Sequence, residues 1–231
     1  MKLSRNTIAI LRNFSKINAG IRFREGRTLR TLDLGKRVLG ETELEEECPV
    51  EASLIDLKEL LLLATKSDRP LELSFDVTHS EDFPLGCATV SEVETKLHIG
   101  SVACCEPEWI KGPPDQGLPG AERADFGFNL TAADLAYLTR ALDERRDTIM
   151  VDAIGETVDL KKITQDSIVS SIRVRNRVPD ANPFQGVIKI EHLKRLMPGP
   201  YAVHIFPAGM ALFMYEGFPL RYWVGFENAR K

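Results

Sequence analysis

The sequence repeats itself at a spacing of about 130 residues. The pattern Leu-Ser/Thr-x-x-x-Ile/Leu-Ala-x-Leu occurs at Leu3–Leu11 and again at Leu130–Leu138. Three further matches follow in the same order: Gly26–Leu29 with Gly155–Val158, Leu57–Leu60 with Leu193–Leu196, and the strand ends Phe75 and Phe206. Collinear matches at a nearly constant spacing indicate two tandem copies of one domain.

Length and composition place the boundary between the two copies. A chain of 231 residues is long enough for two domains of about 110 residues, each with its own core. Residues 106–120 contain four prolines and three glycines and show no hydrophobic periodicity, which is typical of a connector. We therefore predict a first domain at 1–108, an interdomain connector at 109–124 and a second domain at 125–231.

Hydrophobic periodicity predicts the same order of elements in both copies. In the first copy, a helix at 4–17 has Ser4 as its N-cap, and a second helix follows at 55–66. In the second copy, a helix at 131–145 precedes a short helix at 191–197. Alternating runs predict strands at 21–23, 28–32, 37–44, 71–75, 148–151, 157–160, 167–174, 187–190, 201–206, 211–215 and 221–226. The predicted class is α+β, with helices packed on mostly antiparallel sheets.

The first helix has a basic face. At about 100° per residue, Arg5, Arg12 and Lys16 fall within about 40° of one another. The opposite face is apolar and comprises Ile10, Leu11, Phe14 and Ile17. No acidic residue occurs in this helix, although soluble helices usually mix the two signs. The face is either an ordinary solvated surface or a nucleic-acid contact.

The other helices carry a weaker basic signal. In the second copy, Tyr137 and Arg140 are predicted opposite a buried stripe, and the short helix turns Lys194 and Arg195 outward. The pair Arg145–Arg146 suits either DNA contact or the helix dipole. The stripe comprises Leu135, Leu138 and Leu142.

The second helix of the first copy is the least basic of the four. Leu62 and Leu63 are predicted on its outer face, together with Glu59 and Lys66. Its outer face is therefore a poor candidate for a DNA contact.

Acidic residues collect elsewhere in the chain, which has a formal net charge of −4. Five glutamates lie on or beside a predicted strand: Glu41, Glu43, Glu45, Glu46 and Glu47. An acidic sheet surface opposed to basic helices would keep nucleic acid on one side. A solvated edge strand protected by charge explains the run equally well.

Recognisable catalytic motifs are absent from the sequence. It contains no phosphate-binding loop, no dinucleotide-binding fingerprint, no H-E-x-x-H and no G-x-S-x-G. The four histidines are scattered without metal-ligand spacing. We therefore predict that the chain is not an enzyme and that it binds no cofactor or metal.

Cysteine usage and hydropathy indicate the compartment. The four cysteines include no C-x-x-C pair, and we predict reduced, mostly buried thiols. Apolar runs such as Leu60–Ala64 are far shorter than the roughly 18 residues of a membrane span. The first residues have no apolar signal region. These features predict a cytoplasmic protein without a membrane partner.

The quoted residues resemble the T-even bacteriophage sliding clamps, the trimeric DNA polymerase processivity factors. The resemblance covers about two-thirds of the chain, whereas residues 76–125 depart from the pattern. It rests on Met1–Ser4, Asn6–Thr7, Ala9, Leu11, Asn13–Phe14, Ile17–Asn18, Gly20–Ile21, Ile55–Leu57, Pro198–Gly199, Tyr201, Glu216–Gly217, Tyr222–Val224 and Glu227.

The resemblance implies a ring. Each subunit would have two similar domains, each with two inward helices and outer antiparallel sheets, and three subunits would join head to tail around duplex DNA. Lumen cations would attract phosphates without reading bases. We assign this role to Arg5, Arg12, Lys16, Arg140, Lys194 and Arg195.

The resemblance also implies partners in the cytoplasm of an infected bacterial cell. They are the replicative DNA polymerase, an ATP-driven clamp loader, and a late-transcription sigma-like factor with its co-activator. Trp109 and Ile110, beside the connector, are candidates for docking the short hydrophobic tails of such partners. Packing of the connector onto the core is the alternative role of these two side chains.

Two other classes of protein remain possible from the sequence. One is a duplicated DNA-binding module that does not form a ring and holds linear DNA by charge alone. The other is a small-molecule enzyme whose site is assembled from unremarkable carboxylates.

Overall fold

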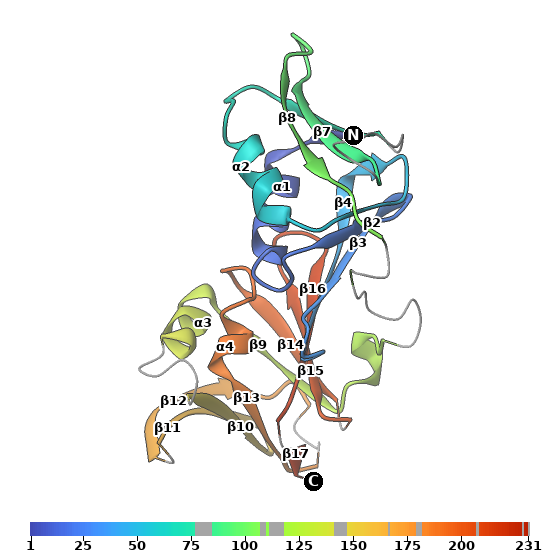
Figure 1. Ribbon diagram of the computed structural model, residues 1–231. Coiled ribbons are helices and arrows are strands. Elements are labelled where there is room, and N and C mark those ends of the chain that lie inside the picture. Colours follow the sequence, from blue (N-terminus) through green and yellow to red (C-terminus); the bar gives the residue numbers. More distant parts are fainter. Residues whose placement is uncertain are drawn as a thin grey trace. The chain divides into compact units, whose positions relative to one another are not determined.

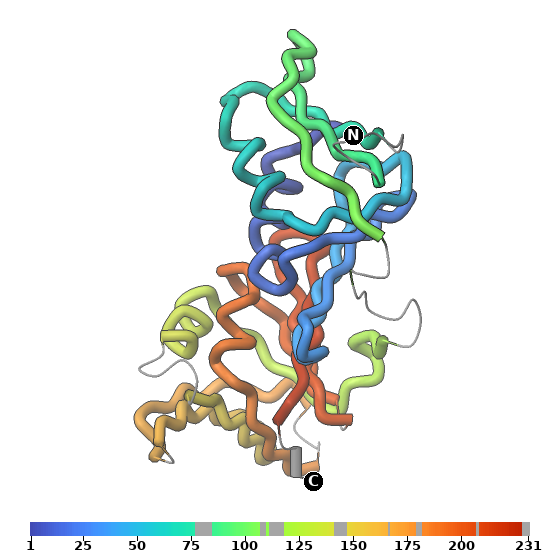
Figure 2. The backbone as a smooth tube through the Cα atoms, in the orientation of Figure 1, coloured from blue at the N-terminus to red at the C-terminus, as the bar shows by residue number. Residues whose placement is uncertain are grey.

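The chain forms two compact units, shown as a computed structural model in Figures 1 and 2. The first comprises Met1–Leu34 and Gly40–Pro113, and the second comprises Gly35–Leu39 and Pro114–Lys231. The structure describes residues 1–76, 85–106, 110, 118–140, 147–165, 167–178, 182–206, 208–227 and 229–230. The predicted connector lies partly outside these ranges, so its bounds stay a prediction.

Two antiparallel sheets build the first unit. One has the strand order β1-β6-β7-β8, and in the other the strands β5-β2-β3-β4 are hydrogen-bonded neighbours in that order. The strands of the first sheet are β1 (Lys2–Leu3), β6 (Leu71–Asp76), β7 (Cys87–Glu92) and β8 (His98–Ala103). Those of the second are β5 (Ala52–Leu54), β2 (Ile21–Phe23), β3 (Gly26–Leu32) and β4 (Val38–Cys48).

The second unit repeats this topology. The strands β9-β14-β15-β16 are hydrogen-bonded neighbours in one sheet, the strands β13-β10-β11-β12 are neighbours in the other, and β17 pairs with the outer side of β13. The strands of one sheet are β9 (Phe126–Leu130), β14 (Tyr201–Phe206), β15 (Met210–Tyr215) and β16 (Leu220–Gly225). Those of the other are β13 (Phe184–Lys189), β10 (Thr148–Ile154), β11 (Thr157–Thr164), β12 (Ser167–Arg175) and β17 (Ala229–Arg230). A short 3-10 turn, η2 (Ala121–Arg123), precedes β9.

Strand pairing confirms the predicted duplication. The strand before the first helix pairs with the strand after the second helix in both units, as β1 with β6 and as β9 with β14. The remaining strands then follow in the same sequence order in each sheet. The predicted fold, two similar α+β domains in tandem, is therefore confirmed.

Each unit packs two helices against its sheets. In the first unit, α1 (Arg5–Phe14) lies beside α2 (Leu57–Ala64), and in the second α3 (Ala132–Thr139) lies beside α4 (Ile190–Leu193) (Figure 1). Both α1 and α3 begin at the N-caps that the repeat aligns, Ser4 and Thr131. Within the described ranges, none of the helices has the length and apolar character needed to span a bilayer.

One predicted side-chain position is wrong. Leu63 was expected on the outer face of α2 with Leu62, but it is 8% exposed whereas Leu62 is 65% exposed. The helix α2 contacts α1, β7 and β8, so it buries a wider part of its circumference than a single stripe of side chains. Leu63 fills the space over Gly100 of β8, where an added Cβ would come within 2.6 Å of its Cδ2.

Candidate nucleic-acid interface

A carboxylate from the neighbouring strand anchors the start of α1. The Ser4 hydroxyl accepts a hydrogen bond from the Thr7 amide at 3.1 Å, as an N-cap does. Glu46 of β4 reaches the same turn, because its Oε1 accepts from the Ser4 amide at 2.7 Å and its Oε2 accepts from the Thr7 hydroxyl at 2.5 Å. This anchor fixes the helix that carries the most basic face of the sequence.

The same contacts change the acidity of Glu46. Burial alone would raise the pKa of its carboxyl, but the hydrogen bonds from Thr7 and Ser4 outweigh burial and lower it. Glu46 is therefore ionised at neutral pH. A negative charge there also suits the positive end of the helix dipole.

The acidic run on β4 is not one acidic surface. Glu41 is buried and pairs with Arg30 at 2.6 Å, and Glu46 caps α1. Glu43, Glu45 and Glu47 are exposed. The expectation of an acidic surface formed by all five glutamates is thus wrong for Glu41, which is buried in its ion pair, and for Glu46, which alternation along the strand turns to the opposite face.

The outer face of α1 is cationic, as the wheel predicted. Arg5, Arg12 and Lys16 are exposed, and none of the three forms an ion pair with a described residue. Ile10, Leu11 and Phe14 on the other side are at most 3% exposed. The positive charge of the outer face is therefore available to a polyanion.

Lys58 adds a cation that is not among the predicted DNA contacts. It is exposed on the first turn of α2, the helix beside α1, where Asp56 caps the helix by accepting from the Lys58 amide at 2.9 Å. The signal was present in the repeat, which aligns Lys58 with Lys194. Lys66, just after α2, is also exposed.

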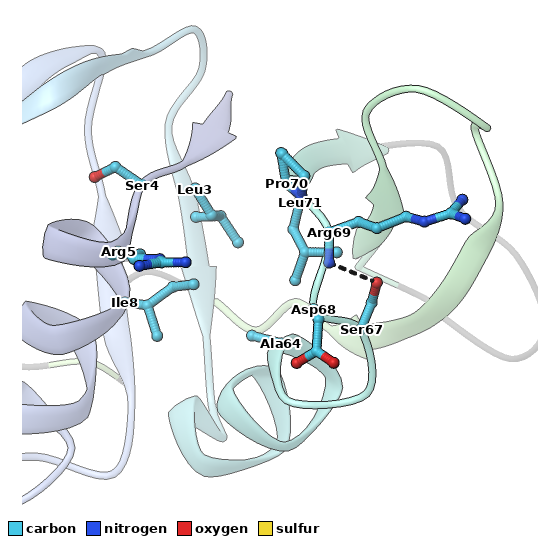
Figure 3. Close-up of a pocket in the computed structure, with 10 residues that line it drawn as sticks. All are labelled: Leu3, Ser4, Arg5, Ile8, Ala64, Ser67, Asp68, Arg69, Pro70 and Leu71. Carbon is cyan, nitrogen blue, oxygen red and sulfur yellow. Dashed lines mark hydrogen bonds between the residues drawn. The ribbon is translucent and has the colours of Figure 1, made fainter.

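Arg5 borders a cavity of about 490 Å³ in the first unit. Figure 3 shows its guanidinium pointing into the space between the start of α1 and the loop that joins α2 to β6. Leu3, Ile8 and Leu71 line this space, and the Arg69 amide across it donates to the Ser67 hydroxyl at 3.1 Å. Arg5 thus borders a hollow of mixed character, because Ser67, Asp68 and Arg69 also line it.

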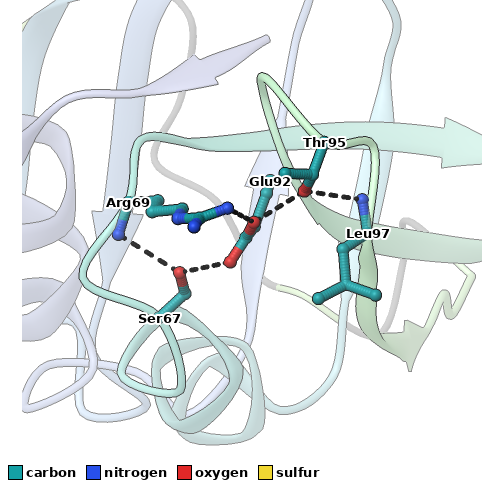
Figure 4. A network of polar contacts seen from close by, with 5 residues as sticks. All are labelled: Ser67, Arg69, Glu92, Thr95 and Leu97. Atoms are coloured by element: carbon teal, nitrogen blue, oxygen red, sulfur yellow. Dashed lines mark hydrogen bonds and ion pairs between the residues drawn. The ribbon is translucent and has the colours of Figure 1, made fainter.

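Glu92 fixes the loop on the far side of that cavity (Figure 4). Its carboxylate accepts from the hydroxyls of Thr95 at 2.6 Å and Ser67 at 2.8 Å, and from Arg69 Nη1 at 3.1 Å. The bonds from Thr95 and Ser67 lower the pKa of Glu92. Because Arg69 is paired with this carboxylate, Arg5 is the unpaired arginine of the two.

The first helix of the second unit also presents its predicted side chains to solvent. Thr131 and Asp134 form a reciprocal capping box, and Leu135 and Leu138 are buried. Tyr137 and Arg140 are exposed, and the Arg140 carbonyl accepts from Lys162 Nζ. Leu142 and the pair Arg145–Arg146 lie outside the described residues.

The cations of the short helix of the second unit are less exposed to solvent than those of α1. Leu193 and Leu196 are 3% and 2% exposed, as predicted, whereas Lys194 and Arg195 are half-buried. The Lys194 amide donates to the Ile190 carbonyl at 3.0 Å and so closes the last turn of α4. Each unit thus displays cations from both of its helices, with α1 contributing the most.

Of the two docking candidates, the structure describes one. Ile110 is half-buried and packs over Gly20, where an added Cβ would collide with its Cδ1. Trp109 lies outside the described residues. The contact between Ile110 and Gly20 favours packing of the connector onto the first unit, so docking by Trp109 and Ile110 stays a prediction.

The cysteines are free thiols, and Cys48 and Cys105 are buried. Burial, followed by the neighbouring thiols Cys87 and Cys105, raises the pKa of Cys104 to about 11. Among the described residues, no group of three or more His, Cys, Asp and Glu side chains is placed to bind a metal ion. The Cys104 sulfur therefore lacks the thiolate character of a reactive or ligating residue.

Comparison with known proteins places the chain near replication proteins of phages. It is 28% identical to the sliding clamp of Vibrio phage KVP40 over 232 residues, covering 98% of this chain and 99% of the relative. It is 24% identical to the sliding clamp of Enterobacteria phage T4 over 238 residues, covering 98% and 97%. No protein-family model matches the chain.

Solved structures agree at the level of the fold. The proliferating cell nuclear antigen of Entamoeba histolytica superposes with a TM-score of 0.68 over 96% of this chain and 94% of its own, at 11% identity. The duplicated topology and this likeness define the class: the chain has the two-domain fold of a DNA sliding clamp. It is a homologue of the sliding clamps of T4-like phages, and this homology supports the function of a DNA polymerase processivity clamp.

Proposed function

We propose that three copies of this chain close head to tail into a ring that encircles duplex DNA and tethers the replicative polymerase. The observation that carries the proposal is similarity to phage sliding clamps over nearly the full length of both chains, on a fold whose two halves repeat one topology. A ring made of repeated domains can surround a duplex, and repetition of the subunit closes it.

Topological linkage requires only weak contact with DNA. Cations on the paired helices attract phosphates without reading bases, so the ring is held near the duplex and still slides. We assign this role to Arg5, Arg12 and Lys16 of the first unit, and to Arg140, Lys194 and Arg195 of the second. Lys58 joins them because it is exposed on α2 beside the basic face of α1.

In this account the chain is a scaffold and not an enzyme. Ring opening is left to a separate ATP-driven loader, and the polymerase and the late-transcription factors dock on the assembled ring. The clamp acts in the cytoplasm of the infected bacterium. We propose these partners and this compartment from the resemblance to phage sliding clamps.

Retention on DNA with blocked ends tests the proposal. Purified protein is incubated with linear duplex, both ends are then closed by bound bulky proteins, and the complex is washed at high salt. A ring stays on the blocked duplex and leaves when a restriction enzyme cuts between the blocks.

The alternative, a DNA-binding module that does not form a ring, predicts a different result. Its retention at high salt would be equally low with free and with blocked ends, because charge alone holds it. That result would overturn the proposed ring.

A further inference from the structure

A second cationic site lies in the second unit, away from the helices. A cavity of about 390 Å³ is lined by Asn129, Arg175, Asn176 and Arg177. These residues come from β9, from the end of β12 and from the two positions after β12. No carboxylate is among its lining residues in the described part of the chain.

The guanidinium of Arg177 is held in a fixed position. Its Nη2 donates to the carbonyls of Val203 at 2.9 Å and Phe128 at 3.2 Å, and its backbone amide donates to the Gly127 carbonyl at 2.8 Å. Gly127 makes room for it, because a Cβ there would meet Arg177 Nη2 at 2.9 Å. A guanidinium has five N–H donors, so Nε and Nη1 keep three for a ligand.

Asn176 completes the support. Its Oδ1 accepts from the Val178 amide at 3.0 Å, and its Nδ2 donates to the Gly155 carbonyl at 2.9 Å. Its side chain is thus used to shape the turn after β12, between the two arginines. The Arg177 guanidinium, which is already ordered, loses little conformational entropy when it binds an anion.

The contrast with Arg173 shows that the positive charge at this site is not neutralised locally. Arg173 lies opposite Asp159 on β11 and binds both of its oxygens, at 2.7 Å and 2.9 Å. Arg175, two residues further on, lies opposite Thr157. Neither Arg175 nor Arg177 forms an ion pair with a described residue. Burial lowers the pKa of Arg177, and the field of Glu216 acts in the opposite direction.

We propose that this cavity is an oxyanion site that binds a phosphate group. Arg177 offers a planar fork, while Arg175 and the Asn129 amide add donors from the end of β12 and from β9. Donors that do not share one plane suit the three oxygens of a phosphate better than the two coplanar oxygens of a carboxylate. The source of the phosphate is either the backbone of DNA or a free phosphate ester.

Titration with inorganic phosphate tests the site. The side-chain Nε–H signals of Arg175 and Arg177 are followed by NMR at constant ionic strength, with chloride as the reference anion. Saturable shifts of these signals with phosphate, and not with chloride, are expected. The Arg175→Gln variant should bind phosphate about tenfold more weakly, because one charge-assisted hydrogen bond is removed.

Arg173→Gln is the matched control, since it removes the same charge from the same strand but not from the cavity. Its phosphate affinity should equal that of the unaltered chain. Glu216→Gln should tighten binding by roughly twofold, because an exposed repulsive charge is removed. Equal weakening by Arg175→Gln and Arg173→Gln, or the absence of saturable shifts, would overturn the proposal.

A second arm identifies the source of the phosphate. If a short DNA duplex competes with inorganic phosphate for the Arg175 and Arg177 signals, the ligand is the DNA backbone. If the duplex leaves these signals unchanged while phosphate shifts them, the ligand is a free phosphate ester. The site does not depend on ring closure, which the blocked-end assay reports separately.

Discussion

Glu46 is the residue whose removal most directly tests how the basic helix is held. Its carboxylate accepts two hydrogen bonds from the first turn of α1, at 2.7 Å and 2.5 Å, and one donor, the Thr7 hydroxyl, belongs to a residue that is fully buried. Hydrogen bonds to charged groups contribute about 1.5–3 kcal/mol each. Because Glu46 is only partly buried, we expect Glu46→Ala to lower the free energy of unfolding by about 3 kcal/mol, near the lower end of the range for two such hydrogen bonds.

Urea unfolding measured by circular dichroism gives the free energy, and hydrogen exchange locates the loss. The amides of α1 should lose protection in Glu46→Ala, while the second unit keeps its own. Glu47→Ala is the matched control, because Glu47 is exposed on the same strand and carries the same charge. Its free energy of unfolding should change by less than about 0.5 kcal/mol.

The effect of Glu46→Ala should also depend on pH. The folded pKa of Glu46 lies below its ordinary value of 4.5, so its contribution is fully present above that value. It is lost as the pH falls through the folded pKa, and the two proteins should then approach equal stability. If Glu46→Ala lowered the free energy of unfolding at neutral pH no more than Glu47→Ala does, the anchoring role of Glu46 would be refuted.

Three further predictions concern other residues. Replacing Arg12 and Lys16 together by Gln should change the free energy of unfolding by less than about 0.5 kcal/mol. The same change should lower the slope of DNA affinity against salt concentration by about one for each phosphate that the variant no longer neutralises. Loss of folding would contradict the exposure of these two side chains. Gly20→Ala should destabilise the first unit by about 1–3 kcal/mol in thermal unfolding, because its Cβ would meet Ile110 and the Leu54 carbonyl; an unchanged midpoint would contradict this packing. Alkylation of Cys104 should accelerate only as the pH approaches about 11, because burial keeps its thiol protonated; rapid reaction near pH 8 would contradict this. The same raised pKa makes its contribution to stability complete below pH 9 and lost as the pH rises through 11.

Local signals explain why much of the fold was predictable. Ser4 and Thr131 cap the helices that they were predicted to cap, because capping depends on the residues of a single turn. The predicted strand at 201–206 coincides with β14, since alternation of apolar residues is also local. The predicted helix at 4–17 is shorter in the structure. Its last residues form a tighter turn in which the Ile17 amide donates to the Phe14 carbonyl at 2.8 Å.

Long-range contacts account for what the sequence did not reveal. Glu46 caps a helix that begins about forty residues earlier, so composition alone placed it with the solvated glutamates. Leu63 is buried because α2 contacts elements on more than one side, which a single helical wheel does not represent. Arg175 and Arg177 are recognised as a candidate site only from their neighbours in the fold. Arg175 lies opposite Thr157 on the adjacent strand, and the Arg177 guanidinium donates to two backbone carbonyls.

Sedimentation equilibrium of the purified chain tests the ring most directly. A closed ring of three subunits should have a solution mass three times that of the 25.9 kDa chain, decreasing only on strong dilution as subunits dissociate. A mass equal to one chain at every accessible concentration would contradict the closed ring, and would leave a DNA-binding module held by charge alone.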